Sequence, residues 1–249
     1  MSISRQPDEP TVRGYSVTHP PGAAVLTTEP GWSQLLYTAR GAVTVVVADE
    51  AFTIPPHRAL WLPDNTRTTV TNRGRVAVRC LYFVSSVPSL PAVPRVVNVP
   101  RFCRELLLHI VERCPLDLAD PVHDALLTVL LDQLEGLPDA PLRLPLPSDP
   151  RGAAAAAADA ADPTASTAAV AARAGTSRRT LERIFAAETG LGLGAWRRRA
   201  HILASLELLA LGSSVTQAGG AVGYTTPSAY VAAFKRELGT TPRGFHREV

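Results

Sequence analysis

The chain has 249 residues, with 46% hydrophobic and 19% charged residues and a formal net charge of +3. This length is sufficient for two domains that each bury their own core. The first twenty residues are polar and contain three prolines, which argues against a signal peptide, and the apolar runs are too short to cross a bilayer. We therefore expect a soluble, cytoplasmic protein.

Residues 11–95 have the pattern of a β-rich domain. Short segments rich in β-branched and aromatic residues alternate with turn residues, such as the Pro-Asp-Asn run at 63–65. The predicted strands cover residues 33–37, 42–48, 51–54, 67–71 and 76–84. Many short strands at close intervals favour a β-barrel or a double-sheet jelly roll.

Aromatic and apolar side chains of this domain are candidates for a small-molecule site, because such barrels often enclose an apolar pocket. The candidate residues are Trp32, Leu36, His57, Trp61 and Tyr82. The alternative, that these side chains fill the core, stays open, and alternation along the strands places some of them outside. We expect no metal and no cofactor, since the histidines show no spacing typical of ligands.

Two helices are predicted within residues 101–136. Apolar residues recur at helical spacing in both, and Asp120 is the expected cap before Pro121 at the first helical position. These apolar stripes are suited to packing on the barrel or on a second copy of the chain, and both alternatives stay open. A proline-rich connector follows at 138–150, and an alanine-rich helix is predicted at 153–161.

Residues 166–185 have the pattern of a helix–turn–helix unit. A helix of small residues ends at Gly175, which can adopt the left-handed backbone of a turn, and Ser177 is a good N-cap for the next helix. Leu181, Ile184 and Phe185 face inward at helical spacing. Arginine pairs with guanine and glutamate accepts from cytosine, so the outward face suits DNA; a solvated charged face is the alternative. The outward residues are Arg178, Arg179, Glu182 and Arg183.

Residues 215–235 repeat this pattern. Gly223 supplies the turn, Thr226 is the expected cap, and Tyr230 and Phe234 face inward. The outward surface offers no bidentate base contact, so we expect it to position the protein mainly on phosphates. The predicted DNA-contacting residues of this unit are Thr225, Thr226, Ser228, Val231, Ala232, Lys235 and Arg236.

Charge is distributed unevenly along the chain. Residues 167–249 contain eleven basic and five acidic residues, a net charge of +6, whereas the first 166 residues have a net charge of −3. Positive charge is therefore concentrated where DNA would lie. Arg197 and Arg198, at the start of a long helix predicted at about 193–211, are further candidates for phosphate contacts.

The last hundred residues, 148–249, resemble the DNA-binding domain of the AraC/XylS family of bacterial transcription regulators. The resemblance rests on residues 171–185, on Glu-Thr-Gly at 188–190 and on the stretch from Val222 to Pro242. Residues 32–37, 55–63 and 79–83, with the junction at 144–151, are similar to the cupin sensor domain of one AraC subgroup. That resemblance implies metal-binding histidines at positions that hold Thr28, Pro30 and Thr68 or one of its neighbours here.

The predicted fold is α+β: an N-terminal cupin-like β-barrel precedes an all-α domain in which a linker helix joins two helix–turn–helix motifs. The predicted domains are a sensor or dimerisation domain at 1–95, a helical hairpin and linker at 96–147, and a DNA-binding domain at 148–249.

We predict a sequence-specific transcription regulator and no enzyme. The first helix–turn–helix reads bases and the second mainly contacts phosphates. The expected partners are double-stranded DNA, a small-molecule effector, a second copy of the chain, and RNA polymerase if the protein is an activator. Two alternatives stay open. A metal-free cupin-type enzyme would need a paired acid and base in the barrel, and a helical protein-binding adaptor would need no charged recognition face.

Overall fold

The computed structural model describes residues 10–85, 87 and 91–245, and residues 25–27 by their backbone alone. Residues 1–9 and 246–249, at the outer ends of the first and last predicted domains, lie outside the described residues. Contacts divide the chain into two units. The first consists mainly of residues 1–45 and 54–140, and the second consists of residues 46–53 and 141–248.

The strands form two antiparallel sheets and not a closed barrel. Of the two architectures that the sequence favours, a barrel and a double sheet, the double sheet is therefore confirmed. The sheet orders are β1-β8-β3-β6-β9 and β10-β5-β4-β7-β2. The strands are β1 Val12–His19, β2 Gly22–Thr27, β3 Trp32–Arg40, β4 Val43–Val47, β5 Glu50–Ile54, β6 Arg58–Leu62, β7 Arg67–Asn72, β8 Val76–Val84, β9 Arg95–Asn98 and β10 Arg143–Pro145.

The register of the first sheet separates its two faces. Leu35 is paired with both Trp61 and Leu81, and Leu36 is paired with Cys80. Because successive side chains of a strand point to opposite faces, Leu35 and Leu36 face different surroundings. Leu35, Trp61 and Leu81 belong to the buried core of the first unit.

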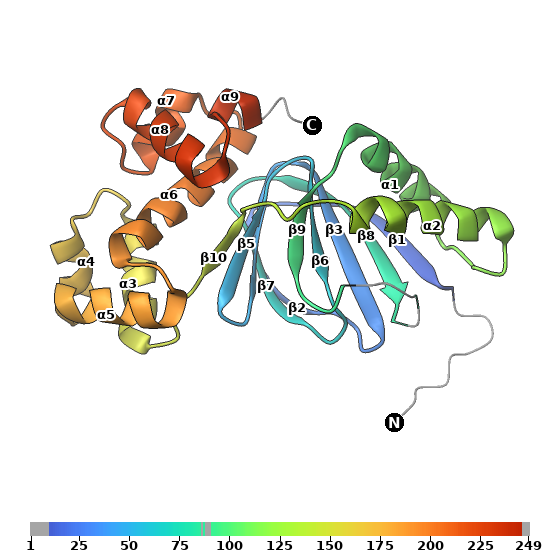
Figure 1. Ribbon diagram of the computed structural model, residues 1–249, viewed down its shortest axis with the longest axis horizontal. Helices are drawn as coiled ribbons and strands as arrows, with labels where there is room; N and C mark the ends of the chain where they lie inside the picture. The colour runs from blue at the N-terminus through green and yellow to red at the C-terminus, as the bar shows by residue number, and fades with distance from the viewer. Residues whose placement is uncertain (1–9, 86, 88–90, 246–249) are drawn as a thin grey trace. The chain divides into compact units, whose positions relative to one another are not determined.

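Two helices, α1 Arg101–Arg113 and α2 Pro121–Glu135, cover this core face of the sheet (Figure 1). Leu107 and Ile110 of α1 and Leu127 and Leu130 of α2 are buried there. The predicted cap of α2 is confirmed, since the Asp120 carboxylate accepts a hydrogen bond from the Val122 amide at 2.8 Å. The stripe predicted for α2 is only partly buried: Val122 and Val129 of this stripe are exposed, together with Phe102 of α1.

The second unit contains seven helices among its described residues. They are α3 Pro150–Ala161, α4 Thr167–Arg173, α5 Arg178–Thr189, α6 Leu193–Ala210, α7 Val215–Ala221, α8 Pro227–Leu238 and α9 Pro242–Phe245. Helix α6 contacts α3 and α5 on one side and α7 and α8 on the other, so it joins two small helical groups (Figure 1).

Aromatic side chains fasten both groups to α6. The rings of Phe185 (α5) and Trp196 (α6) meet edge to face at 4.8 Å between centroids. The buried Tyr230 hydroxyl of α8 donates to the Ser205 hydroxyl of α6 at 2.8 Å. The linker helix α6 is therefore part of the core of the second unit.

None of the helices in the described residues has the length and apolarity that a membrane crossing requires.

Candidate DNA interface and ligand cavity

The two predicted turns have the same backbone geometry. Gly175 and Gly223 both adopt positive φ, at +63° and +89°. The Gly175 amide donates to the Ala172 carbonyl, and the Gly223 amide donates to the Gly220 carbonyl, at 3.0 and 3.1 Å. The positive φ at each glycine ends one helix and redirects the chain into the next, which is the geometry that a helix–turn–helix requires.

Hydroxyl caps begin both second helices, as the sequence predicts. Ser177 accepts from the Thr180 amide at 3.1 Å, and Thr226 accepts from the Ala229 amide at 3.3 Å. Each cap satisfies one of the backbone amides that a helix N-terminus leaves without a helical partner. Helices α5 and α8 therefore start at equivalent points of their units.

The exposed face of α5 is strongly basic. Leu181, Ile184 and Phe185 are buried, whereas Arg178, Arg179 and Arg183 are exposed and Glu182 is half-buried. Arg178 forms an ion pair with Glu182, with 3.4 Å between Nε and Oε1. Within the described residues, Arg179 and Arg183 form no ion pair, so their guanidinium groups are available to an anionic partner.

The exposed face of α8 has a different chemistry. Tyr230 and Phe234 are buried, as expected from the helical spacing, whereas Val231, predicted to face outward, is half-buried. The exposed positions hold hydroxyl groups, a methyl group and two basic side chains near the end of the helix. These exposed residues are Thr225, Thr226, Pro227, Ser228, Ala232, Lys235 and Arg236.

Arg197 is held inside the second unit. Its Nε lies 2.5 Å from Oδ1 of the buried Asp159, and its two terminal nitrogens donate to the Thr167 hydroxyl and the Ala165 carbonyl. The side chain is only 14% exposed. The structure thus gives Arg197, predicted as a phosphate contact, a buried structural role, and we leave it out of the proposed interface.

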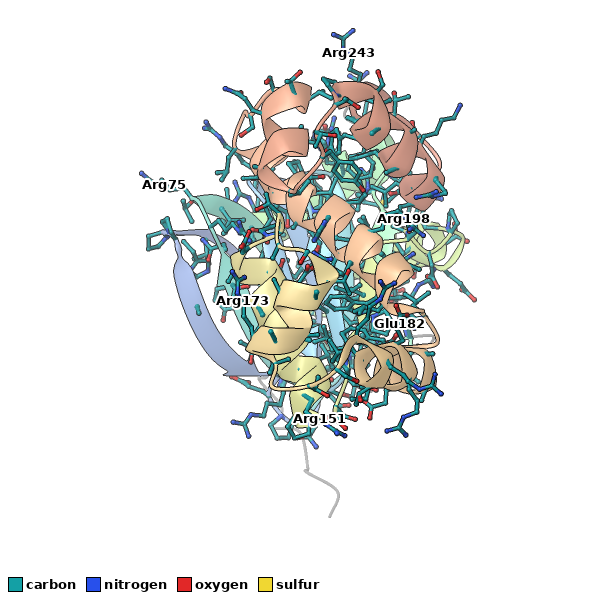
Figure 2. The ribbon with its side chains drawn as sticks, turned by 90° about the vertical axis from the view of Figure 1, so that its left-hand side faces the viewer. Arg75, Arg151, Arg173, Glu182, Arg198 and Arg243 are labelled. Atoms are coloured by element: carbon teal, nitrogen blue, oxygen red, sulfur yellow. The ribbon has the colours of Figure 1, made fainter. Side chains whose placement is uncertain are left out.

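Arg198 stays within reach of a partner. Its side chain is 37% exposed and forms an ion pair with Glu237 of α8 at 3.4 Å. In Figure 2, Arg198 and Glu182 project on the same side of the second unit, from α6 and α5. Its neighbour Arg199 instead donates to the Arg143 carbonyl at 2.7 Å.

A cavity of about 600 Å³ lies within the first unit, between strands β1, β3 and β8 on one side and β2 and β7 on the other. Valine, leucine and alanine side chains form much of its wall. The polar lining includes Gln34, Cys80 and Tyr82 of the first sheet, together with Thr28 and Thr68. The volume is in the range of small-molecule sites.

Three of the five predicted ligand-binding residues line this cavity: Trp32, Leu36 and Tyr82. The other two do not. Trp61 is paired with Leu35 and belongs to the helix-covered core, and His57 contacts the Tyr37 hydroxyl and Arg104 at 3.3 Å each. Prediction from the sequence missed Gln34, although alternation from Leu36 along β3 places Gln34 on the same face.

Two positions where the resemblance implies metal-binding histidines, Thr28 and Thr68, line the cavity. Threonine supplies no imidazole for a first-row metal. Within the part of the chain that the structure describes, no three His, Cys, Asp or Glu side chains are grouped to hold a metal ion.

Comparison with known proteins agrees with this geometry. Residues 170–248 match the family model of a helix-turn-helix domain. The chain is 29% identical over 211 residues to the HTH-type transcriptional regulator NimR of Escherichia coli, which covers 84% of this chain and 77% of NimR. It is 38% identical over 69 residues to the regulator RipA of Corynebacterium diphtheriae, covering 28% of this chain and 21% of RipA. The structure of ToxT from Vibrio cholerae matches 96% of this chain and 99% of ToxT, with 12% identity and a TM-score of 0.40.

Residues 170–248 thus form a helix-turn-helix domain, and most of the chain is similar to an HTH-type transcriptional regulator.

The chain is a DNA-binding transcription regulator with a helix–turn–helix domain. The matched domain begins inside α4 and contains α5, α6, α7, α8 and α9, which include both helix–turn–helix units. The N-terminal unit, with its cavity, lies before the matched residues.

Proposed function

We propose that α5 reads the base sequence of the operator and that α8 mainly fixes the protein on the DNA backbone. The observation that carries this division is the contrast between the two exposed faces. Arg179 and Arg183 of α5 are exposed and have no ion pair within the described residues. Such groups form bidentate hydrogen bonds with guanine in the major groove. Glu182, paired with Arg178, adds an acceptor for cytosine.

The face of α8 offers single hydrogen bonds and charge. Thr225, Ser228, Lys235 and Arg236 are exposed and suit phosphate oxygens, while Ala232 suits a thymine methyl group. Thr226 combines an exposed position with its cap to α8, and Val231 is half-buried. Arg198 of α6 completes the proposed set of phosphate contacts.

The cavity of the first unit is the proposed site of a small-molecule effector. It is large enough for such a ligand, and it is lined by both apolar and hydrogen-bonding side chains. An effector controls DNA binding only as far as its affinity differs between two states of the protein. We therefore propose that a ligand bound in this cavity controls DNA binding by the protein.

The exposed Phe102, Val122 and Val129 on α1 and α2 support a second proposal, a homodimer formed through these helices. Two chains would double the DNA contacts.

Contact with RNA polymerase is expected if the protein activates transcription. A cytoplasmic location is expected because the proposed target is DNA.

Fluorescence anisotropy with DNA from beside the protein's own gene tests the proposed role of α5. At near-physiological salt, Arg183→Ala is expected to weaken specific binding by about 1–3 kcal/mol, because one bidentate base contact is lost. Arg75→Ala is the matched control, since it removes the same charge from an exposed position of the first unit.

Lys235→Ala tests the different role proposed for α8. Loss of a phosphate contact should weaken binding to all sequences about equally and reduce the slope of log Kobs against log salt by about 1. Equal effects of Arg183→Ala on operator and unrelated DNA would contradict the proposed division.

A further inference from the structure

Gln34 and Tyr82 form a polar pair in the wall of the cavity. The Gln34 amide nitrogen donates to the Tyr82 hydroxyl at 3.2 Å and to the Cys80 sulfur at 3.5 Å. Gln34 is only 8% exposed. Within the described residues, its amide oxygen accepts no hydrogen bond and the Tyr82 hydroxyl donates none. This oxygen is not among the fully buried unpaired polar atoms of the described residues, so it is open to the cavity and available to a ligand.

The pair presents one donor and one acceptor in either amide orientation. As placed, Tyr82 offers its O–H and Gln34 offers its carbonyl oxygen. If the amide is flipped, Tyr82 donates to the Gln34 oxygen, and the pair then offers the amide N–H and the phenolic oxygen. A complementary ligand group therefore needs an acceptor and a donor side by side, as in a primary carboxamide.

The surroundings of the pair disfavour charge. Burial raises the pKa of the Cys80 thiol to about 11, and burial also raises the pKa of Tyr82 well above its usual value. Both groups are neutral at physiological pH. The desolvation that raises these two pKa values also acts against a charged ligand group at the same place.

The charged residues of the lining neutralise each other. Arg13 forms an ion pair with Glu29 at 3.4 Å, and its guanidinium carbon lies 4.0 Å from the centroid of the Trp32 ring. The cation and the anion that line the cavity are thus paired. Neither presents an uncompensated charge that would favour an ionic ligand.

We infer that the cavity takes an uncharged, largely apolar small molecule whose carboxamide-like group binds Gln34 and Tyr82. This inference rests on the effector site proposed above and specifies its ligand class. The apolar walls, which include Leu36, Val70 and Val78, enclose the remainder of the molecule.

Two probes of nearly equal shape test it, 4-butylbenzamide and 4-butylbenzoate. Binding to the full chain is measured at pH 8 by isothermal titration calorimetry, where the benzoate is ionised. The amide is expected to bind at least tenfold more tightly. Gln34→Leu and Tyr82→Phe should each reduce amide affinity about five- to tenfold, the loss of one hydrogen bond. Tyr37→Phe, on the helix-covered face, should leave amide affinity unchanged.

Each contrary outcome overturns a named part of the inference. Benzoate binding as tight as amide binding would exclude the preference for an uncharged ligand, and unchanged amide affinity in both cavity variants would exclude the Gln34–Tyr82 pair as the recognition group. Binding of neither probe would overturn the inference as a whole. Anisotropy on the same preparations without a probe measures DNA binding separately, so loss of probe binding with intact operator binding leaves the regulator function standing.

Discussion

Arginines of the second unit serve two different purposes, which their surroundings distinguish. Arg183 is exposed on α5, whereas Arg197 is enclosed by Asp159, Thr167 and Ala165. Successive residues of a helix point about 100° apart, so the run of arginines at 197–199 cannot present one basic surface. Arg197 pairs with Asp159 in the interior, whereas Arg198 and Arg199 both lie within ion-pair distance of Glu237.

Arg197→Ala is expected to lower the free energy of unfolding by about 3 kcal/mol, because the Asp159 carboxylate, 3% exposed, would lose its principal partner in the interior. Of the residues that the structure describes, only His201 would remain hydrogen-bonded to that carboxylate, at 2.9 Å. Urea denaturation measures the effect. Arg198→Ala is the control and should cost about 0–1 kcal/mol, since its ion pair is partly exposed. An unchanged urea midpoint for Arg197→Ala, together with weaker DNA binding, would instead restore Arg197 to the interface.

At the scale of the element, the two adjacent glycines of α7 are not equivalent. A Cβ added at Gly219 would lie 2.8 Å from Cγ of the Tyr230 ring, whereas a Cβ at Gly220 would meet open space. Gly219 therefore allows α7 to approach α8 closely. Gly220 has no such role, and its cost in helix propensity is uncompensated by packing.

A matched pair of variants tests this difference by thermal denaturation. Gly220→Ala should stabilise the protein by about 0.5–1 kcal/mol, because alanine is the better helix former. Gly219→Ala should destabilise it by about 1–3 kcal/mol, because α7 and α8 must shift apart. If both variants changed the stability in the same direction, the close packing of α7 on Tyr230 would not explain why position 219 is glycine.

The contact of α8 with α6 predicts a loss of stability in alkali. Burial raises the pKa of Tyr230 to about 12, from an ordinary value of 10.0. Because the folded-state pKa is raised, this contribution to stability is fully present below about pH 10 and is lost as the pH rises towards 12. Burial raises the pKa values of Tyr37, Tyr82 and Tyr224 as well, so they act in the same direction.

Tyr230→Phe should therefore flatten the decline in urea midpoint above pH 10. At pH 7 it should cost about 1 kcal/mol through loss of the hydrogen bond to Ser205. A wild-type midpoint that stays constant to pH 12 would contradict this account of the α6–α8 contact.

Helices were predictable from the sequence because their signals are local. Caps at Ser177 and Thr226, the turn at Gly223 and the apolar spacing of α5 lie within a few residues of each other. The face on which Trp61 lies depends instead on its pairing with Leu35, 26 positions earlier in the chain. Strand register is set by such distant partners, so the sequence predicted the β-rich domain and three cavity residues but not the complete lining.

At the scale of the whole molecule, charge and fold agree on one function. Residues 167–249 have a net charge of +6, in a chain whose total is +3, and these residues form both helix–turn–helix units. Positive charge alone gives binding that is insensitive to sequence and sensitive to salt. Specificity must come from side chains that reach base edges, for which α5 supplies the candidates.

The specificity ratio of the full chain is the most direct test of this account. An operator is selected from a random-sequence duplex library, and its affinity is compared with that of a scrambled duplex of equal length at 150 mM salt. The account predicts at least a roughly thousandfold preference for the selected duplex. It also predicts that the double variant Arg179→Ala, Arg183→Ala loses most of that preference. A ratio near one for the wild-type chain, or no enrichment in the selection, would contradict sequence-specific recognition through α5.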